Sequence, residues 1–535
     1  MDVGTLIARA AARFGERTAI EGVDVPDHPG PPAGLGRLTF AQLGDRVLRL
    51  ANGLRSLGLR PGDRVLDLQT NSVTYLETDL AIRSAGLVRA ALNYRLHPSD
   101  WERIAEDSGA RALIYDARFE ADTASLRDQL EHVVVIGDGP GTPYQHVIDA
   151  GSPTPLAAQE PDSLCGLHYS SGTTGHPKGA KRTHRNWFAS VVNMTHDVLG
   201  RVPGPDTTYL HAGPVTHTSG LFVLPFLVAG ARQLVMPTWD AQTFLQAVTE
   251  RGATHTALVP TMVSRLLATS GADRETLRGL QMLGYAGAPM PPEQMRAAFE
   301  QLTPNLVQYY GLVEAIPPVT VLDAADHARG LDADPDLLSS AGRPALGVEI
   351  TVVDDEGRAL PPGEVGEVVT RGDHVMSGYW NAQARQDLSK SVSDGWLHTG
   401  DLGRLSEDGH LWLVDRKGDM IISGGYNIYP REVEEVVAEV PGVAEVAVVG
   451  VSDPDWGERV VALVRAAAGQ AVNEDVVLEH CRASMASYKK PKEVRLVEEF
   501  PLSSTGKIAK KVLRTELEDR ARQDATSQLG QVGQP

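Results

Sequence analysis

The chain has 535 residues, of which 42% are hydrophobic and 22% are charged, and its formal net charge is −19 at pH 7. A chain of this length is longer than a single hydrophobic core accommodates, so we expect a soluble globular protein of two or more domains. The negative charge argues against a general nucleic-acid binder, but it leaves room for a local basic pocket that holds an anion.

The cysteines and the N-terminal residues predict a cytoplasmic protein. Cys165 and Cys481 are the two cysteines, and their wide separation gives no disulfide framework, which favours a reducing compartment. The first twenty residues carry Asp2 and Glu16 and lack the unbroken apolar core of a signal peptide. The longest apolar run, residues 221–231, contains a proline and is too short to span a bilayer, so no membrane span is expected.

Strands alternate with helices in the first part of the chain. Thr39 to Gln42 has the pattern of a capping box, and apolar residues follow it at helical spacing. Residues 64–68 and 112–115 are typical of buried strands, and residues 73–85 predict a helix between them. This alternation indicates an α/β architecture of layers with parallel strands.

The stretch from Tyr169 to Gly179, YSSGTTGHPKG, combines hydroxyl residues, glycines and a lysine in one loop. Its glycines allow N–H groups to turn toward one point, and Lys178 adds a mobile positive charge. Convergent donors around a cation suit a polyphosphate. The loop is not a Walker A loop, because no Lys-Ser or Lys-Thr pair follows Gly175. Residues 180–183 read as extended, and we expect a helix to begin near Asn186.

This loop resembles the phosphate-binding signature of the adenylate-forming superfamily, which includes acyl-CoA synthetases, nonribosomal peptide adenylation domains and luciferases. Further signatures follow in the family's order between Thr39 and Lys511. The resemblance implies a large N-terminal domain of α/β layers with a small β subdomain, residues 1–416. A smaller, mobile α+β domain follows in residues 417–520. Residues 521–535 are polar and lack periodicity, so we expect them to be disordered.

By this resemblance, one set of residues binds the phosphates and the adenine of ATP. The phosphate residues are Ser170, Ser171, Gly172, Thr173, Thr174, Gly175 and Lys178. The adenine residues are Gly287, Ala288, Pro289, Tyr310 and Gly311. Adenine is expected between the Gly287–Pro289 backbone and the Tyr310 ring, because small residues let a flat ring approach the backbone closely.

The resemblance also assigns the ribose and the metal ion. Asp401 would accept hydrogen bonds from both ribose hydroxyls, a task that suits a carboxylate with two oxygens, and Arg416 would contact the ribose. Glu314 would hold the Mg²⁺ that accompanies ATP, since this hard cation takes carboxylate and phosphate oxygens. The family usually has threonine before this glutamate, and here the residue is Val313, which cannot donate to the α-phosphate. The loss of one charge-assisted hydrogen bond costs about 1.5–3 kcal/mol.

The carboxylic acid is expected near His217, Gly220 and Gly311. His217 matches a family histidine at the mouth of the acid pocket, where it gates or hydrogen-bonds the incoming acid. The apolar stretch Leu221–Val228 behind it has two interpretations. It lines an acyl tunnel, or it is ordinary core, which is the commoner fate of such a run.

The catalytic lysine and the mobile elements lie near the C-terminus. Lys507 matches the family lysine that bridges the carboxylate and the α-phosphate, and it stands at the tip of a flexible turn. Gly418 occupies the hinge position, where the family usually has lysine or aspartate. On the CoA side, the resemblance implies a glycine turn made by Gly424, Gly425 and Tyr426. The basic cluster in residues 488–492 is either solvated surface or a contact for CoA phosphates.

The sequence therefore predicts an ATP-dependent acid–CoA ligase. A carboxylate and ATP would give an acyl-AMP and pyrophosphate, and CoA would then take the acyl group as a thioester. Val313 and Gly418 keep a second interpretation open, in which the acceptor is a carrier-protein thiol, an amine or nitrite. A third interpretation, a degenerate nucleotide-binding module, conflicts with the presence of Glu314, Asp401 and Lys507.

Overall fold

The computed structural model describes residues 2–26, 28, 36–170, 177–381, 392–423, 426–453, 456–467, 469–502 and 508–531. Several expected site residues lie outside this part of the chain: Ser171, Gly172, Thr173, Thr174, Gly175, Gly424, Gly425 and Lys507. The chain divides into two compact units. The first comprises Met1–Thr351, Val369–Thr399 and Glu407–Leu411, and the second comprises Val352–Val368, Gly400–Ser406 and Trp412–Pro535.

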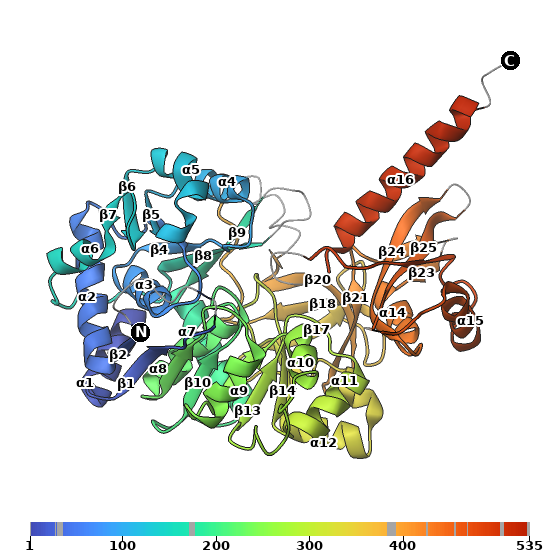
Figure 1. Ribbon diagram of the computed structural model, residues 1–535, viewed down its shortest axis with the longest axis horizontal. Helices are drawn as coiled ribbons and strands as arrows, with labels where there is room; N and C mark the ends of the chain where they lie inside the picture. Colours follow the sequence, from blue (N-terminus) through green and yellow to red (C-terminus); the bar gives the residue numbers. More distant parts are fainter. Residues whose placement is uncertain are drawn as a thin grey trace. The chain divides into compact units, whose positions relative to one another are not determined.

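The first unit contains a sheet whose described strands run in the order β7-β6-β5-β3-β4-β8-β9 (Figure 1). These strands are β3 (Arg64–Leu68), β4 (Val88–Ala91), β5 (Ala112–Asp116), β6 (His132–Ile136), β7 (Thr142–Pro143), β8 (Leu164–Ser170) and β9 (Lys178–Thr183). Neighbouring strands are parallel except for β8 and β9, which form an antiparallel pair. The phosphate loop therefore joins two adjacent, antiparallel strands at the edge of the sheet.

A second sheet of this unit runs in the order β16-β15-β14-β13-β12-β10-β11-β1-β2. Its strands are β1 (Thr18–Gly22), β2 (Arg37–Thr39), β10 (Thr208–His211), β11 (Arg232–Val235), β12 (His255–Leu258), β13 (Met282–Tyr285), β14 (Leu306–Tyr310), β15 (Thr320–Leu322) and β16 (Arg343–Pro344). Within this order, the six neighbouring strands β14, β13, β12, β10, β11 and β1 are parallel. At the two edges, β2 pairs antiparallel with β1, and β15 and β16 pair antiparallel beyond β14. The two sheets confirm the predicted α/β class with parallel strands.

Helices pack on these sheets and on one another. They are α1 (Val3–Phe14), α2 (Phe40–Ser56), α3 (Val73–Ser84), α4 (Pro98–Ser108), α5 (Ala124–Asp128), α6 (Tyr144–Ala150), α7 (His184–Asn193), α8 (Val223–Val228), α9 (Ala241–Thr249), α10 (Pro260–Leu267), α11 (Pro292–Ala297) and α12 (Ala324–Asp332). The predicted capping box begins α2: Gln42 N–H donates to the Thr39 hydroxyl at 3.2 Å, and Gln42 Oε1 accepts from Thr39 N–H at 2.9 Å. Short 3₁₀ or π segments are Ala117–Phe119, Ala121–Thr123, Met194–Val198, Thr218–Phe222, Ala298–Leu302 and Pro335–Ser339.

A small sheet contains β17 (Glu349–Val353), β18 (Gly366–Arg371), β20 (Trp396–Leu405) and β19 (Val392–Ser393) in that order, and β21 (Leu411–Arg416) pairs with β20. The second unit also holds β22 (Ile421–Ser423), β23 (Tyr426–Ile428), β24 (Val443–Asp453), β25 (Gly457–Ala466) and β26 (Glu493–Leu496). Its helices are α14 (Pro430–Ala438), α15 (Glu474–Ser484) and α16 (Lys510–Gln531). Apolar side chains such as Val433, Val448 and Val460 form its core, which confirms the expected α+β character.

The C-terminal residues differ from the expectation of disorder. Helix α16 continues to Gln531, through most of the segment expected to be irregular (Figure 1). Leu513 and Leu517 pack in an apolar cluster with β24 and β25 and fix the first turns. Residues 518–531 include three glutamines, two alanines, two arginines, one glutamate and one leucine, which have high helix propensity and extend a helix that is already nucleated.

The described residues contain no helix with the length and apolar content that a membrane crossing requires. Cys165 and Cys481 are both buried and are not bonded to each other.

Candidate active site

The ends of the phosphate loop are held together by β8 and β9. Ser170, the last residue of β8, lies opposite Lys178, the first residue of β9, in the antiparallel ladder. The loop between them is thus a hairpin connection whose tip lies outside the described residues. The predicted extended segment 180–183 lies in β9, and the predicted helix follows it as α7, which confirms both. Thr183 caps α7 by accepting from Asn186 N–H.

Tyr379 connects the lysine of this hairpin with Glu314. The Tyr379 hydroxyl donates to Glu314 Oε1 at 2.7 Å, and Lys178 Nζ lies 5.7 Å from the centroid of the Tyr379 ring. Backbone hydrogen bonds fix this arrangement, since Lys181 N–H donates to Gly378 O at 2.8 Å and Trp380 N–H to Gly179 O at 2.9 Å. A cation and a carboxylate, remote in sequence, therefore lie at one tyrosine.

The backbone around Glu314 is held from two sides. Met376 N–H donates to the carbonyl of Glu314 at 2.8 Å, and Arg182 Nη2 donates to the carbonyl of Val313 at 3.0 Å. Arg182 belongs to β9, so it ties the strand after the phosphate loop to the segment that carries Glu314. Val313, where the family usually has threonine, is thus fixed through its backbone by a buried arginine.

Arg182 is a buried cation in an unusual environment. Burial and the neighbouring Arg83 lower the pKa of its guanidinium to about 9, while Glu314 acts in the opposite direction. Both arginines lie over the Trp187 ring, with guanidinium carbons 5.6 Å and 4.3 Å from its centroid. The described partners leave Arg182 Nε without a hydrogen bond. Positive potential therefore concentrates beneath the segment of Val313 and Glu314.

His217 is placed by a turn and by one side chain. Its Nε2 lies 3.2 Å from Nδ2 of Asn93, which follows β4. Gly220 N–H donates to the carbonyl of His217 at 3.1 Å, and a Cβ on Gly220 would lie 2.2 Å from the Val215 carbonyl oxygen. The close turn after His217 therefore requires glycine.

Aromatic side chains fill the space behind this turn. Phe222 and Phe226 are fully buried, and the Tyr209 ring stacks on Phe222 with centroids 4.6 Å apart. Tyr309 packs edge-on against Phe222 at 6.0 Å. No surface remains on the two phenylalanines for a passing acyl chain. Of the two interpretations of Leu221–Val228, the structure supports ordinary core, built from a 3₁₀ turn and α8.

The expected adenine residues follow two neighbouring strands. β13 and β14 are parallel, with Tyr285 opposite Gln308, so the segments after them leave the same edge of the sheet. Gly287 has a φ of 91°, a conformation that favours glycine. Gly311 follows β14, and a Cβ there would lie 2.6 Å from Cγ of Pro317. The structure thus brings the Gly287–Pro289 and Tyr310–Gly311 segments to one edge.

The second unit holds the expected ribose and hinge residues. Asp401 is buried, and its Oδ1 accepts from Nε of Arg416 at 3.0 Å. A Cβ on Gly418 would meet nothing within 4 Å, so no packing contact requires glycine at this position. Tyr426 is 56% exposed and stacks on Tyr488 at 4.6 Å.

The metal site depends on the nucleotide. Within the described residues, no group of three or more His, Cys, Asp or Glu side chains is arranged to hold a metal ion. A single carboxylate such as Glu314 fits Mg²⁺ only when phosphate oxygens and water complete the octahedron.

Comparisons with known proteins identify the family of this chain. The model of the AMP-binding enzyme matches residues 7–380, and the model of the AMP-binding enzyme C-terminal domain matches residues 432–507. The chain belongs to the AMP-binding enzyme family. A feruloyl-CoA synthase of Amycolatopsis sp is 37% identical over 479 residues, with 89% of this chain and 93% of that protein covered.

Two solved structures show the same fold. ATP-bound MatB from Rhodopseudomonas palustris superposes with a TM-score of 0.85 and 29% identity, over 97% of this chain and 99% of that one. The amide bond synthetase McbA from Marinactinospora thermotolerans gives a TM-score of 0.85 and 30% identity, over 96% and 99% of the two chains. These matches confirm the predicted family and fold. They also confirm the predicted class, an ATP-dependent acyl- or aryl-CoA synthetase-type ligase that works through an acyl-AMP.

For this AMP-binding enzyme, the sequence interpretation missed Asn93, Arg182 and Tyr379. Tyr379 is 65 residues from Glu314, and Asn93 is 124 residues from His217. Their neighbours in sequence form no pattern that predicts such contacts. Arg182 could have been found from one feature of the sequence. It is an arginine on a strand expected to be buried, opposite Gly166, and a buried arginine must find partners in the interior.

Proposed function

We propose that this ligase activates an aromatic carboxylic acid with ATP and transfers it to CoA. One observation carries the proposal: Lys178 and Glu314 meet at Tyr379, at the base of the hairpin that presents the phosphate loop. A cation for phosphate oxygens and a carboxylate for Mg²⁺ are the two groups that a bound triphosphate requires. The residue roles below follow from this arrangement together with the family resemblance.

In the proposed complex, the hydroxyl, glycine and lysine residues of the loop bind the phosphates: Ser170, Ser171, Gly172, Thr173, Thr174, Gly175 and Lys178. Adenine lies between the Gly287–Pro289 backbone and the Tyr310 ring. Asp401 accepts from the ribose hydroxyls, and Arg416, which donates to Asp401 at 3.0 Å, contacts the ribose. Glu314 would hold Mg²⁺, and that ion would supply positive charge beside the phosphate oxygens that leave as pyrophosphate.

The first half-reaction must bring two anions together. Two unit charges 4 Å apart interact by about 4 kcal/mol at an effective dielectric constant of 20, so the carboxylate and the α-phosphate repel each other. Lys507 is proposed to lie between them and to replace repulsion by attraction. His217, held by Asn93, would orient the carboxylate at the pocket mouth, with Gly220 and Gly311 leaving room for it. The carboxylate oxygen attacks the α-phosphorus, and pyrophosphate leaves.

The second half-reaction uses the mobile domain, proposed to span residues 417–520 and to turn at Gly418. Rotation removes Lys507 and brings the Gly424, Gly425 and Tyr426 turn to the acyl-AMP. The CoA thiol then attacks the carbonyl carbon, and AMP leaves.

The surface of the second unit supports CoA as the acceptor. Tyr426 and Tyr488 form an exposed aromatic stack, and Lys492 Nζ lies 4.0 Å from the centroid of the exposed Trp456 ring. Aromatic faces beside lysines suit an adenine ring and the phosphates of CoA. An amine acceptor is the second candidate, because the similar McbA is an amide bond synthetase.

The aromatic acid is inferred from the wall behind His217. Tyr209, Phe222 and Phe226 close the direction in which a long alkyl chain would extend. A flat ring is short enough for a pocket that this buried core closes, whereas a long alkyl chain is not. The similar feruloyl-CoA synthase is consistent with this class of substrate.

Pyrophosphate release with a panel of acids tests the proposal. Hydroxylated arylpropenoic and benzoic acids, a medium-chain and a long-chain fatty acid are each supplied with ATP and Mg²⁺, with CoA, with an amine or with neither. We expect the fastest release with an aromatic acid and a CoA-dependent increase in AMP. Preference for the long-chain acid would refute the aromatic substrate, and AMP release that depends on the amine alone would refute CoA.

The buried, unbonded Cys165 and Cys481 suit a reducing compartment, and we propose a cytoplasmic enzyme.

A further inference from the structure

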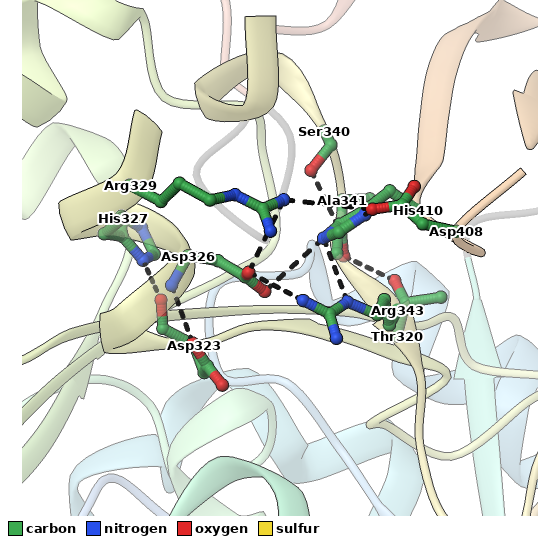
Figure 2. A network of polar contacts seen from close by, with 11 residues as sticks. Thr320, Asp323, Asp326, His327, Arg329, Ser340, Ala341, Arg343, Asp408 and His410 are labelled. Atoms are coloured by element: carbon green, nitrogen blue, oxygen red, sulfur yellow. Dashed lines mark hydrogen bonds and ion pairs between the residues drawn. The ribbon is translucent and has the colours of Figure 1, made fainter. Parts of the chain in front are cut away.

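A polar network surrounds Asp326 on α12 (Figure 2). Asp326 is 6% exposed. Its Oδ1 accepts from Nη2 of Arg343 at 2.9 Å, and Nη2 of Arg329 lies 3.9 Å from the same oxygen. A buried carboxylate is costly unless cations and donors surround it, and here two arginines do so.

His410 joins the turn between β20 and β21 to this network. Nε of Arg343 carries a hydrogen and lies 3.1 Å from Nε2 of His410, so Nε2 accepts and the imidazole proton is on Nδ1. Nδ1 then donates to Asp408 Oδ2 at 2.9 Å. The side chain of His410 is 1% exposed, and Arg329 lies 3.9 Å from Asp408 Oδ2. The two carboxylates and the two arginines thus balance their charges, and His410 joins them through both ring nitrogens.

The backbone fixes the same turn. Ala341 N–H donates to Leu411 O at 2.6 Å, and Leu411 N–H donates to Gly342 O at 2.9 Å. The Thr320 hydroxyl donates to Ala341 O at 2.6 Å and ties this pairing to β15. The turn is therefore held both by main-chain hydrogen bonds and by the side chains of Asp408 and His410.

The next residue of α12 contacts the strands that lead to the expected adenine site. His327 Nδ1 donates to the Asp323 carbonyl, so Nε2 accepts from the Tyr285 hydroxyl at 2.8 Å. That hydroxyl also lies 3.2 Å from Oε1 of Gln308. Tyr285 ends β13 two residues before Gly287, and Gln308 lies in β14 two residues before Tyr310. Helix α12 thus contacts Tyr285, the last residue of β13, and the turn of the β20–β21 hairpin, and Tyr285 in turn contacts Gln308 of β14.

We propose that α12 is a brace for the nucleotide site, with Asp326 and His410 as positioning residues. The inference rests on the proposed function, in which Asp401 on β20 and Arg416 on β21 bind the ribose. Asp326 acts through Arg343 and His410 on the turn that joins these two strands. Without the carboxylate, Arg343 and Arg329 lose the acceptor that they share, and the side chains no longer fix the turn to α12. Asp326 itself does not touch substrate.

The test replaces Asp326 by asparagine and uses Glu77→Gln as the matched control. Glu77 is also buried, accepts from Arg46 Nε at 2.5 Å and from the Tyr144 hydroxyl at 2.8 Å, and has no role in the site. Both variants exchange a buried carboxylate for an amide of the same size. The measurements are the ATP dissociation constant by calorimetry, the KM values for ATP and for the acid, and the melting temperature.

We expect Asp326→Asn to weaken ATP binding and raise the KM for ATP by about tenfold or more, because small displacements of binding groups have effects of this size. The KM for the acid should stay within a factor of about two. Glu77→Gln should lower the melting temperature without a change in either KM. His410→Ala should have an effect like that of Asp326→Asn, and the double variant should be less than additive because the two side chains belong to one network.

Equal ATP affinity in the wild type and Asp326→Asn, with only a lower melting temperature, would overturn the proposal, as would fully additive effects on ATP affinity. If Asp326→Asn does not fold, Arg329→Gln is the second variant. It removes a partner that lies 3.9 Å from Asp326 Oδ1, farther than Arg343, and it must still lower ATP affinity. A wild-type protein that binds ATP but activates no acid would refute the proposed function, and the calorimetric comparison would still decide the role of α12.

Discussion

At the scale of single residues, Tyr379 explains how a lysine and a glutamate that are remote in sequence come together. Its hydroxyl holds Glu314 at 2.7 Å, and its ring lies beside Lys178. The hydrogen bond is charge-assisted, since the acceptor is a carboxylate, and such bonds contribute about 1.5–3 kcal/mol. Tyr379 thus orients the carboxylate that is proposed to bind Mg²⁺.

The variant Tyr379→Phe removes this hydrogen bond and keeps the ring. We expect the Mg²⁺ concentration for half-maximal pyrophosphate release to rise about tenfold, the factor that corresponds to 1.4 kcal/mol. Tyr115→Phe is the control, because the Tyr115 hydroxyl donates to the Pro140 carbonyl at 2.8 Å, outside the candidate site. An equal Mg²⁺ requirement in the two variants would contradict the role of Tyr379.

The proposed role of Lys507 belongs to the first half-reaction only, so its replacement should affect the two half-reactions differently. Lys507→Ala should block formation of the acyl-AMP, because the repulsion between carboxylate and α-phosphate is no longer screened. Thioester formation from supplied acyl-AMP and CoA should remain within about threefold of the wild type, since the lysine has left the site by then. Single-turnover assays of each half-reaction measure both effects. Equal loss in the two assays would show that the lysine does not have this role.

At the scale of elements, the proposed hinge residue, Gly418, has few steric constraints. Gly418 follows β21, and a side chain at this position would meet nothing within 4 Å. The absence of packing fits a residue whose backbone angles change, while a lysine or aspartate would add a latch that this chain lacks.

A pair of substitutions tests whether Gly418 is the hinge. Gly418→Ala should be nearly silent, because a methyl group meets no neighbour. Gly418→Pro fixes φ near −65° and should slow one half-reaction at least about tenfold more than the other, because rotation is restricted. Single-turnover rates of acyl-AMP and thioester formation give the comparison. Proline and alanine variants with the same pair of rates would exclude a hinge at this residue.

At the scale of the whole molecule, burial of neutral histidines makes stability depend on pH. Desolvation lowers the pKa to about 4 for five of them: His184, His211, His255, His327 and His374. The unfolded value is about 6.5, so between these values the unfolded chain binds more protons than the folded chain. The free energy of unfolding must therefore fall as the pH falls through this window.

We expect urea midpoints to be constant between pH 7 and pH 8 and to decrease steadily below about pH 6.5, with the greatest loss by about pH 4. Far-ultraviolet circular dichroism at each pH measures the midpoints. Acidic groups whose pKa is lowered in the folded state, such as Asp63, add to the loss near the lower end of the window. A midpoint that stays constant from pH 7 to pH 5 would contradict the contribution of the buried histidines.

Sequence patterns of a few residues correctly predicted helices and strands that are determined by neighbouring residues. The capping box at Thr39, the strand after the phosphate loop and the helix expected near Asn186 all appear in the structure. The roles carried over from the family stay proposals, although Gly287, Tyr310 and Glu314 follow strands of one sheet. For residues 521–535 the local pattern was misleading. Their polar composition suggested disorder, but α16 continues to Gln531 from first turns that pack in the apolar cluster of the second unit.

The sequence by itself determined the α/β class, the family and the positions of the phosphate loop, since each depends on residues close together along the chain. Only the tertiary structure decided that Tyr379 bonds Glu314, that Asn93 reaches His217 and that α12 contacts both β13 and the β20–β21 turn. These contacts join residues separated by tens to more than a hundred positions. Burial and chain topology select such partners, and neither leaves a periodic mark in the sequence.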